Sequence, residues 1–331
     1  MSDPVIDFHF GAPEDPQSGC YWSKEFEKGI AFLAMRLVTG SLFGKINIER
    51  VRNHILGVTN GSKYVHYVVL LAMDQVYDVN GNTRREIIHL YVPNSYIASV
   101  AKENNRTLLG ASIHPYRTDW EEDLEYCLKN PAVLCKWIPS SQQIDLIHPK
   151  CIAFYKKLAE IRLPLLCHAG PEGAIPSFDK TSQDLNNPNL LRHALDAGVT
   201  VIAAHAALPL LPPPFESDEP YQALVSLFRE ADTNGWKHYA DLSAINIGPR
   251  GQYVEKLKKD IPPERLLFGS DYPIPMLDTS QKPNLSIGHW LKHFFQTVAA
   301  KNPLDKNYLL IKNMDFGDAL FTNASAVLRL G

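Results

Sequence analysis

The sequence predicts an α/β fold, a distorted (β/α)8 TIM barrel with a helical insertion after strand 1. Three observations predict it: eight short apolar runs, helical periodicity between them, and polar residues that follow the runs at regular intervals. The 331 residues suffice for one barrel, because α/β barrels often exceed about 200 residues as one domain. We therefore expect residues 1–331 to form a single barrel domain.

The predicted strands are short, and several are continuously hydrophobic rather than alternating. Strands that are covered by helices on both faces have this character. The eight runs are residues 5–10, 64–73, 107–113, 132–137, 163–167, 199–204, 238–242 and 265–269.

The connections between the runs carry helix signals. Residues 150–162 place apolar side chains at helical spacing. The Asn-Pro pair at 187–188 is typical of an N-cap and first turn, and Gly198 marks the end of that helix. Asp218 opens another helix. Polar landmarks after the last five runs are 32, 37, 36 and 30 residues apart, about one βαβ unit each.

The first connection is about twice as long as the others, from His9 to Asp74. Residues 25–38 and 48–56 within it have a helical pattern. We therefore expect a helical insertion at about residues 13–60, placed where it could cap the barrel.

Composition and charge exclude several classes of protein. The net charge of −3 gives no basic bias toward nucleic acid. No apolar run approaches the roughly 20 residues of a membrane span, and the first residues lack the basic start of a secretory signal. Five cysteines without CxxC spacing predict reduced core residues. We expect a cytoplasmic protein that binds neither nucleic acid nor membranes.

Four polar residues follow buried strand-like runs and would converge on one rim of the barrel. They are His9, His168, His205 and Asp271. Each alone is explained by a structural histidine or a turn aspartate. Together they offer imidazoles and a carboxylate, which are typical ligands of zinc, and a catalytic site needs about three of them.

An ordered series of motifs carries a family resemblance over nearly the whole chain. The motifs are VIDFHFG, LLGASIHP, VLCKWIP, LPLLCHAG, VIAAHAA, ERLLFGSDYP and TNASAVLRL. They resemble the amidohydrolase superfamily, in the branch of aminocarboxymuconate-semialdehyde decarboxylase-like enzymes. The resemblance implies that His9, His168 and Asp271 bind one metal ion. It also implies that Asp271 accepts a proton from water and that His205 orients water or substrate.

Gly11 departs from the family pattern, which has a second strand-one histidine at this position. Three ligands remain, and His205 could be a fourth. Glu14, Asp15 or a substrate oxygen could also fill the vacant position. We expect one divalent ion, zinc first, with manganese or another ion as alternatives.

Five further residues are predicted to contact a substrate. Lys136 corresponds to a lysine that bridges two metals in binuclear relatives when carboxylated; we favour a non-bridging lysine that holds a substrate carboxylate. His114 and Trp137 could line the pocket or be structural. Glu172 could touch substrate or form a turn. Arg250 could pair with an anionic substrate.

The predicted function is hydrolysis of an amide, lactone or ester-like bond in a small molecule by metal-activated water. The first alternative is a non-oxidative decarboxylase of an unsaturated or aromatic carboxylate, because both reactions use the same strand ends. The second is a catalytically inactive barrel that binds a ligand, which Gly11 motivates. The resemblance also implies that the chain can form a homodimer.

Overall fold

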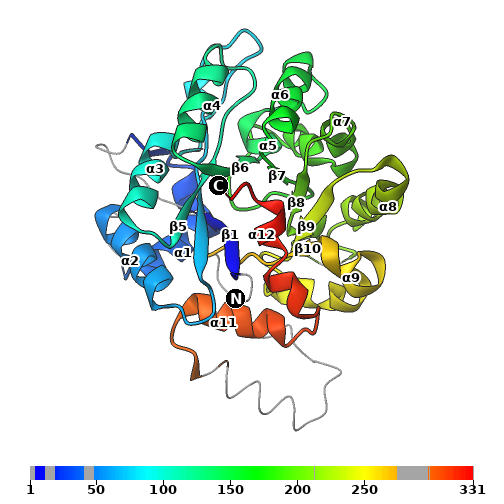
Figure 1. Ribbon diagram of the computed structural model, residues 1–331. Helices are drawn as coiled ribbons and strands as arrows, with labels where there is room; N and C mark the ends of the chain where they lie inside the picture. The colour runs from blue at the N-terminus through cyan, green and yellow to red at the C-terminus, as the bar shows by residue number, and fades with distance from the viewer. Residues whose placement is uncertain are drawn as a thin grey trace.

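The computed structural model describes residues 4–11, 19–40, 48–211, 213–273, 297 and 299–330, without the side chains of 8–11, 48, 248 and 249. Eight strands pair in parallel and curl into a TIM-barrel-like sheet, so the predicted fold class is confirmed (Figure 1). In pairing order they are β1 (Ile6–Gly11), β3 (Tyr67–Leu71), β5 (Thr107–Ala111), β6 (Ala132–Trp137), β7 (Leu165–His168), β8 (Val201–Ala204), β9 (His238–Asp241) and β10 (Leu266–Leu267). Within the described ranges no backbone pair joins β10 back to β1.

Helices surround the curled sheet and cover its outer face (Figure 1). They are α3 (Asn94–Glu103), α4 (Trp120–Lys129), α6 (Pro149–Glu160), α7 (Arg192–Asp196), α8 (Glu219–Asn234), α9 (Val254–Asp260) and α11 (Pro303–Lys312). Two short helices lie elsewhere: α5 (Pro139–Gln142) directly follows β6, and α12 (Ala324–Val327) contacts the inner core. Two of the sequence signals are visible as caps. The Asn187 side chain accepts from the Asn189 N–H, and Gly235 ends α8 in the left-handed conformation.

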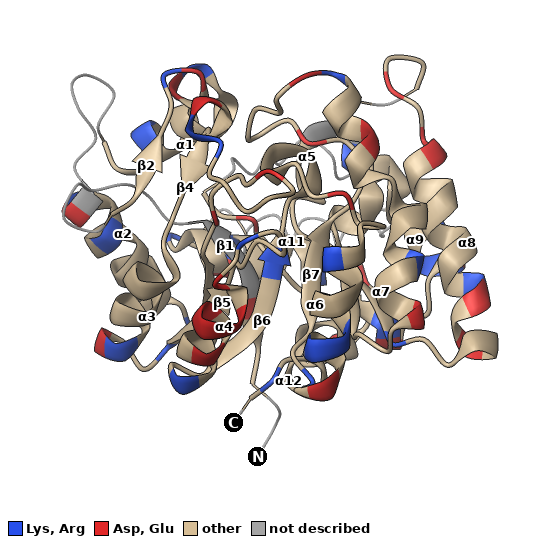
Figure 2. Ribbon diagram, turned by 90° about the horizontal axis from the view of Figure 1, so that it is seen from above, with Lys and Arg blue, Asp and Glu red and all other residues tan. Residues whose placement is uncertain are grey.

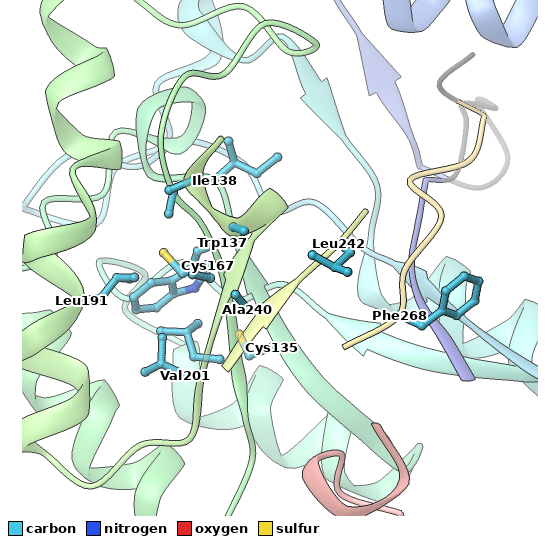
Figure 3. Packing of buried hydrophobic residues seen from close by; sticks show 14 of the residues in the cluster. Cys135, Trp137, Ile138, Cys167, Leu191, Val201, Ala240, Leu242 and Phe268 are labelled. Atoms are coloured by element: carbon cyan, nitrogen blue, oxygen red, sulfur yellow. The ribbon is translucent and has the colours of Figure 1, made fainter. Parts of the chain in front are cut away.

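Side chains of the strands alternate between two cores because successive residues of a strand point to opposite faces. The inner core includes Leu166, Ile202 and Leu267, and it is closed at one end by Ala324 of α12. The outer core lies between the sheet and the helices, where Trp137 packs in the layer that Figure 3 shows. With one end filled, the inner core leaves the opposite end of the barrel for a site.

The residues between β1 and β3 form the inserted segment, here the described residues 19–40 and 48–61. It contains β2 (Tyr21–Trp22), α1 (Ile30–Val38) and α2 (Ile48–Gly61), so both predicted helices are present. β2 pairs antiparallel with β4 (Leu90–Tyr91). Figure 2 shows β2, β4 and α1 at the end of the barrel toward which β6 points. This is the carboxyl end of the strands, where barrel enzymes keep their active sites.

The five cysteines are all buried free thiols, as the sequence predicts. In the described part of the chain, no helix is long and apolar enough to cross a membrane.

Candidate active site

A cavity of about 330 Å³ opens at the carboxyl ends of the strands. Its lining combines apolar side chains with six polar residues that the sequence predicts as ligands, catalytic groups or substrate contacts. These six are Lys136, His168, Glu172, His205, Arg250 and Asp271. They come from the ends of five different strands or the loops that follow them. The barrel therefore brings together groups that are up to 135 positions apart in the sequence.

His168 is the last residue of β7, and both of its ring nitrogens contact acceptors. Nδ1 lies 3.1 Å from Oε2 of Glu172, and Nε2 lies 3.2 Å from the carbonyl oxygen of Pro171. An imidazole satisfies two acceptors at once only when both nitrogens carry protons. The other carboxylate oxygen of Glu172 accepts from the backbone N–H groups of Ala174 and Ile175, at 2.6 and 2.9 Å. Glu172 thus forms the turn and also holds His168.

His205 follows β8 in a left-handed turn that contains no glycine. The φ angles of His205, Ala206 and Ala207 are 55°, 49° and 51°. Such residues are strained and persist where the surroundings hold them. The carboxylate of Asp241 accepts from the His205 N–H at 2.9 Å, and Ser243 contacts Nδ1 of His205 through its hydroxyl at 2.8 Å. Because Ser243 engages Nδ1, chemistry in the cavity would use Nε2.

The loops after β7 and β8 approach each other closely at Gly170. Its φ of 82° is left-handed, and an added Cβ would lie 2.9 Å from the carbonyl oxygen of Ala207. This contact sets the spacing between the two strand ends. The rings of His168 and His205 lie 5.1 Å apart between centroids, in an edge-to-face arrangement.

Asp271 follows β10 in a turn that β1, α2 and one internal hydrogen bond hold. The Ser270 N–H donates to Oδ1 of Asp7 in β1 at 2.8 Å, which connects the first and last strands. The Tyr272 N–H donates to the Ser270 hydroxyl at 3.1 Å. The Tyr272 hydroxyl lies 2.6 Å from Nε2 of His54 in α2. Asp271 itself has a φ of 57°, so its backbone is held in an uncommon conformation beside the cavity.

Two buried cations line the cavity. Lys136 of β6 is 2% exposed, and among the described residues its Nζ has no hydrogen-bond partner. Burial lowers its pKa, and the carboxylates of Asp241 and Asp271 counteract part of that effect. Arg250 is also 2% exposed, with N–H groups on the carbonyls of Leu208 and Pro209 at 3.1 and 3.2 Å. Burial lowers the pKa of Arg250 as well. A buried ammonium is costly without a partner, so an anion beside Nζ of Lys136 would lower that cost.

The structure places two predicted substrate contacts, Trp137 and His114, outside the cavity lining. Trp137 follows Lys136 directly, so it points to the other face of β6 and donates to the Ile113 carbonyl at 2.8 Å. His114 is fully buried, with Nε2 2.8 Å from the Gln142 carbonyl, and burial lowers its pKa to about 3. Both side chains have structural roles, which are the alternatives that the sequence left open.

The predicted metal ligands include His9, whose side chain lies outside the described residues, as do Glu14 and Asp15. Among the side chains that the structure does describe, no three His, Cys, Asp or Glu residues gather as a ligand set. The donor types at the cavity, imidazole and carboxylate, are those that zinc and manganese accept. His168 could coordinate an ion only by giving up one of its two acceptors.

Several supporting residues were not singled out from the sequence. Tyr272 lines the cavity, and Ser243 fixes His205. Part of the apolar lining comes from the inserted segment, including Phe26 and Met35. For Asp7, which accepts from the Ser270 N–H, the sequence does offer a signal. The motif VIDFHFG places an aspartate inside an apolar strand, and acidic residues are rarely buried without a partner.

The model of the amidohydrolase family matches residues 72–298, which is more than half of the chain. The chain belongs to the amidohydrolase family. No curated protein matches its sequence. The motifs that follow β7, β8 and β10, with His168, His205 and Asp271, lie inside the matched region.

Solved structures share the fold at low sequence identity. An uncharacterised TIM-barrel protein from Bordetella bronchiseptica is 14% identical, with a TM-score of 0.58 over 97% of this chain and 99% of that chain. A probable 2-pyrone-4,6-dicarboxylic acid hydrolase from Acinetobacter baumannii, with citric acid bound, is also 14% identical, with a TM-score of 0.56 over 94% and 99%. A dihydroxybenzoic acid decarboxylase from a Polaromonas species, with manganese and the inhibitor 2-nitroresorcinol, is 14% identical, with a TM-score of 0.51 over 97% and 100%. The structural neighbours thus include both hydrolases and decarboxylases.

Proposed function

We propose that this amidohydrolase cleaves an amide, lactone or ester-like bond with water, in a small molecule that carries a carboxylate. The observation that carries the proposal is the buried Nζ of Lys136, which lines the same cavity as Asp271 and has no hydrogen-bond partner among the described residues. A substrate carboxylate would supply that partner, and Arg250 offers further N–H donors on the same lining.

The remaining polar groups are suited to the bond-breaking step. Asp271 would accept a proton from the attacking water and return it to the leaving group. Nε2 of His205 would accept from the attacking water and orient it. The Ser243 hydroxyl donates to Asp241, and Nδ1 of His205 lies 3.2 Å from the Ser243 carbonyl oxygen, so Nδ1 carries the proton of the neutral ring. General acid–base assistance of this kind typically contributes about 10²–10⁴-fold to the rate.

The family resemblance supports a divalent ion, zinc or manganese, held by His9, His168 and Asp271. When bound, such an ion would lower the pKa of a water molecule toward neutrality. To serve as a ligand, His168 would exchange its contact with Glu172 or with the Pro171 carbonyl. The manganese of the decarboxylase neighbour supports this choice of ion.

The second candidate function is non-oxidative decarboxylation of an unsaturated or aromatic carboxylate. The apolar lining favours it, because removing water from a carboxylate raises its energy relative to neutral carbon dioxide. The decarboxylase neighbours give the same reaction class some support. In this reaction Asp271 or His205 would deliver a proton to carbon.

The deciding experiment combines metal analysis with product analysis. Purified protein and the His168→Ala variant are assayed for bound metal, and then incubated with lactones, amides and carboxylates in ¹⁸O-labelled water. One ion per chain that is lost in the variant, with ¹⁸O in a product, supports the hydrolase. Release of carbon dioxide, with no ¹⁸O in the organic product, selects the decarboxylase. Full activity of Asp271→Asn would overturn both assignments.

A further inference from the structure

The cavity is lined by two chemically different sets of side chains. Lys136 of β6 and Arg250 after β9 are its buried cations, and both interact with the carboxylates of Asp271 and Glu172. The second set is the apolar wall, made by two side chains of α1, one that precedes α1, two at β4 and one after β7. The apolar wall consists of Ile30, Met35, Phe26, Leu90, Val92 and Ile175.

Four of the six wall residues, Phe26, Met35, Leu90 and Ile175, belong to a separately packed cluster. Phe26, Phe32 and Met35 form its buried centre, and Leu90 and Ile175 pack against them. The rings of Phe26 and Phe32 meet edge to face with centroids 5.9 Å apart. Such packing keeps the wall in place whether or not a ligand is bound.

The backbone polar groups of Ile175 in this wall already have hydrogen-bond partners. The Ile175 N–H donates to Glu172 at 2.9 Å, and the Ile175 carbonyl accepts from the Ser141 hydroxyl at 3.1 Å. A hydroxyl or carboxylate of a ligand that reached the buried part of this wall, at Phe26, Met35 and Val92, would lose its water and gain no partner. Each unpaired polar group would lower affinity by roughly tenfold, whereas each buried methylene would raise it by roughly fourfold.

We propose, on the basis of the proposed function, that the substrate is an amphiphilic carboxylate. Its carboxylate binds at Lys136 and Arg250, and its body is a bare hydrocarbon that lies against the apolar wall. The cavity of about 330 Å³ accommodates more than a single small ring, since ligand pockets for drug-sized molecules start at about 300 Å³. The inserted segment therefore determines specificity by excluding a second polar end.

The test is calorimetric binding of matched carboxylates to the full chain. The pair 4-butylbenzoate and 4-(3-hydroxypropyl)benzoate have side chains of equal length and differ in one terminal group, methyl or hydroxyl. We expect the butyl compound to bind about tenfold more tightly. Terephthalate and 2,6-dihydroxybenzoate should bind more weakly than either.

Two variants of α1 supply the matched control. Ile30 is 60% exposed and lines the cavity, whereas Leu37 is 52% exposed on the same helix and lies outside the lining. Both sites tolerate a polar side chain because they face water. Ile30→Asn should reduce the preference for the butyl compound several-fold, and Leu37→Asn should leave it unchanged.

The outcomes separate this inference from the proposed function. Equal binding of the matched pair, tighter binding of 2,6-dihydroxybenzoate, or an equal effect of the two α1 variants would overturn the amphiphilic substrate. Absence of binding by the whole series would overturn it as well. In each of these cases the metal and product analysis still decides, by itself, whether the protein is a hydrolase.

Discussion

Nε2 of His54 and the hydroxyl of Tyr272 lie 2.6 Å apart, and this hydrogen bond joins α2 of the inserted segment to the turn that carries Asp271. The two rings are also nearly parallel, with centroids 6.1 Å apart. Burial lowers the pKa of His54, which favours the neutral imidazole. The inserted segment thus has two roles: it lines the cavity and it supports a candidate catalytic residue.

Removal of the Tyr272 hydroxyl should destabilise the protein by about 1 kcal/mol, because one hydrogen bond is lost while the stacked ring remains. The measurement is urea unfolding of Tyr272→Phe, of His54→Ala and of the double variant. We expect a coupling energy of about 0.5–1.5 kcal/mol between the two residues. Strictly additive effects would show that the contact contributes nothing to stability.

Gly170→Ala should be more destabilising than the same change at Gly235. Both glycines have positive φ, so an alanine at either site costs about 1–2 kcal/mol in backbone strain. Only at Gly170 does the new Cβ also meet backbone, at 2.9–3.1 Å from Ala207. We expect at least about 1 kcal/mol of additional loss in denaturant unfolding.

The same pair tests whether the loop contact positions the site. Gly170→Ala would push the loops after β7 and β8 apart, and His168 and His205 would separate with them. Metal content and turnover should fall in this variant and remain normal in Gly235→Ala. Normal values in both would refute the idea that Gly170 sets the spacing of the two histidines.

The barrel could be predicted from sequence because strand periodicity and strand-end spacing are local signals. Lys136 and Trp137 show the limit of such reasoning at the candidate site. They are neighbours after one apolar run, and only their alternation across β6 sends one into the cavity and the other into the outer core. The sequence of a continuously apolar strand does not indicate which side chains point into the barrel and which point toward the helices.

Other features depend on contacts between distant segments. Met35 lies 133 residues from His168 in the sequence, yet both line the cavity. The left-handed turn that begins at His205 has no glycine to signal it, since Asp241 holds it from the next strand. Local propensity carries no information about either arrangement.

Lys136→Met should raise stability at neutral pH and abolish carboxylate binding. The lowered pKa of Lys136 means that burial outweighs its attraction to Asp241 and Asp271. Folding therefore disfavours the charged amine, and an apolar side chain of similar length removes a cost of about 1 kcal/mol or more. Thermal unfolding and 4-butylbenzoate titration measure the two effects.

The stabilisation by Lys136→Met should shrink as pH rises toward the ordinary lysine pKa. A base whose pKa is lowered by folding binds fewer protons when folded, so the wild-type protein gains stability with rising pH. Lys157→Met, at a half-exposed position on α6, should change stability little at any pH. A lower melting temperature for Lys136→Met at pH 7 would show that the amine has a stabilising partner.

Asp74 should make the folded protein less stable as pH rises from about 4 to 6. Its carboxyl group is buried after β3, accepts from the His114 N–H at 2.7 Å and lies 3.2 Å from Arg117. Burial raises its pKa from 3.8 to about 6, and Arg117 offsets only part of that effect. Between these values the unfolded chain loses its proton and the folded chain keeps it, so the slope of stability against pH is negative.

The predicted size follows from the difference between the two pKa values. The wild-type protein should lose about 2 kcal/mol relative to Asp74→Asn between pH 4 and 6, out of a total of about 3 kcal/mol that levels off above about pH 7. Asp78→Asn is the matched control, because hydrogen bonds from Asn82 lower the pKa of exposed Asp78 and predict the opposite slope. Urea unfolding of the three proteins measures both. A wild-type advantage over Asp74→Asn that grows with pH would mean that Arg117, rather than burial, controls this carboxyl group.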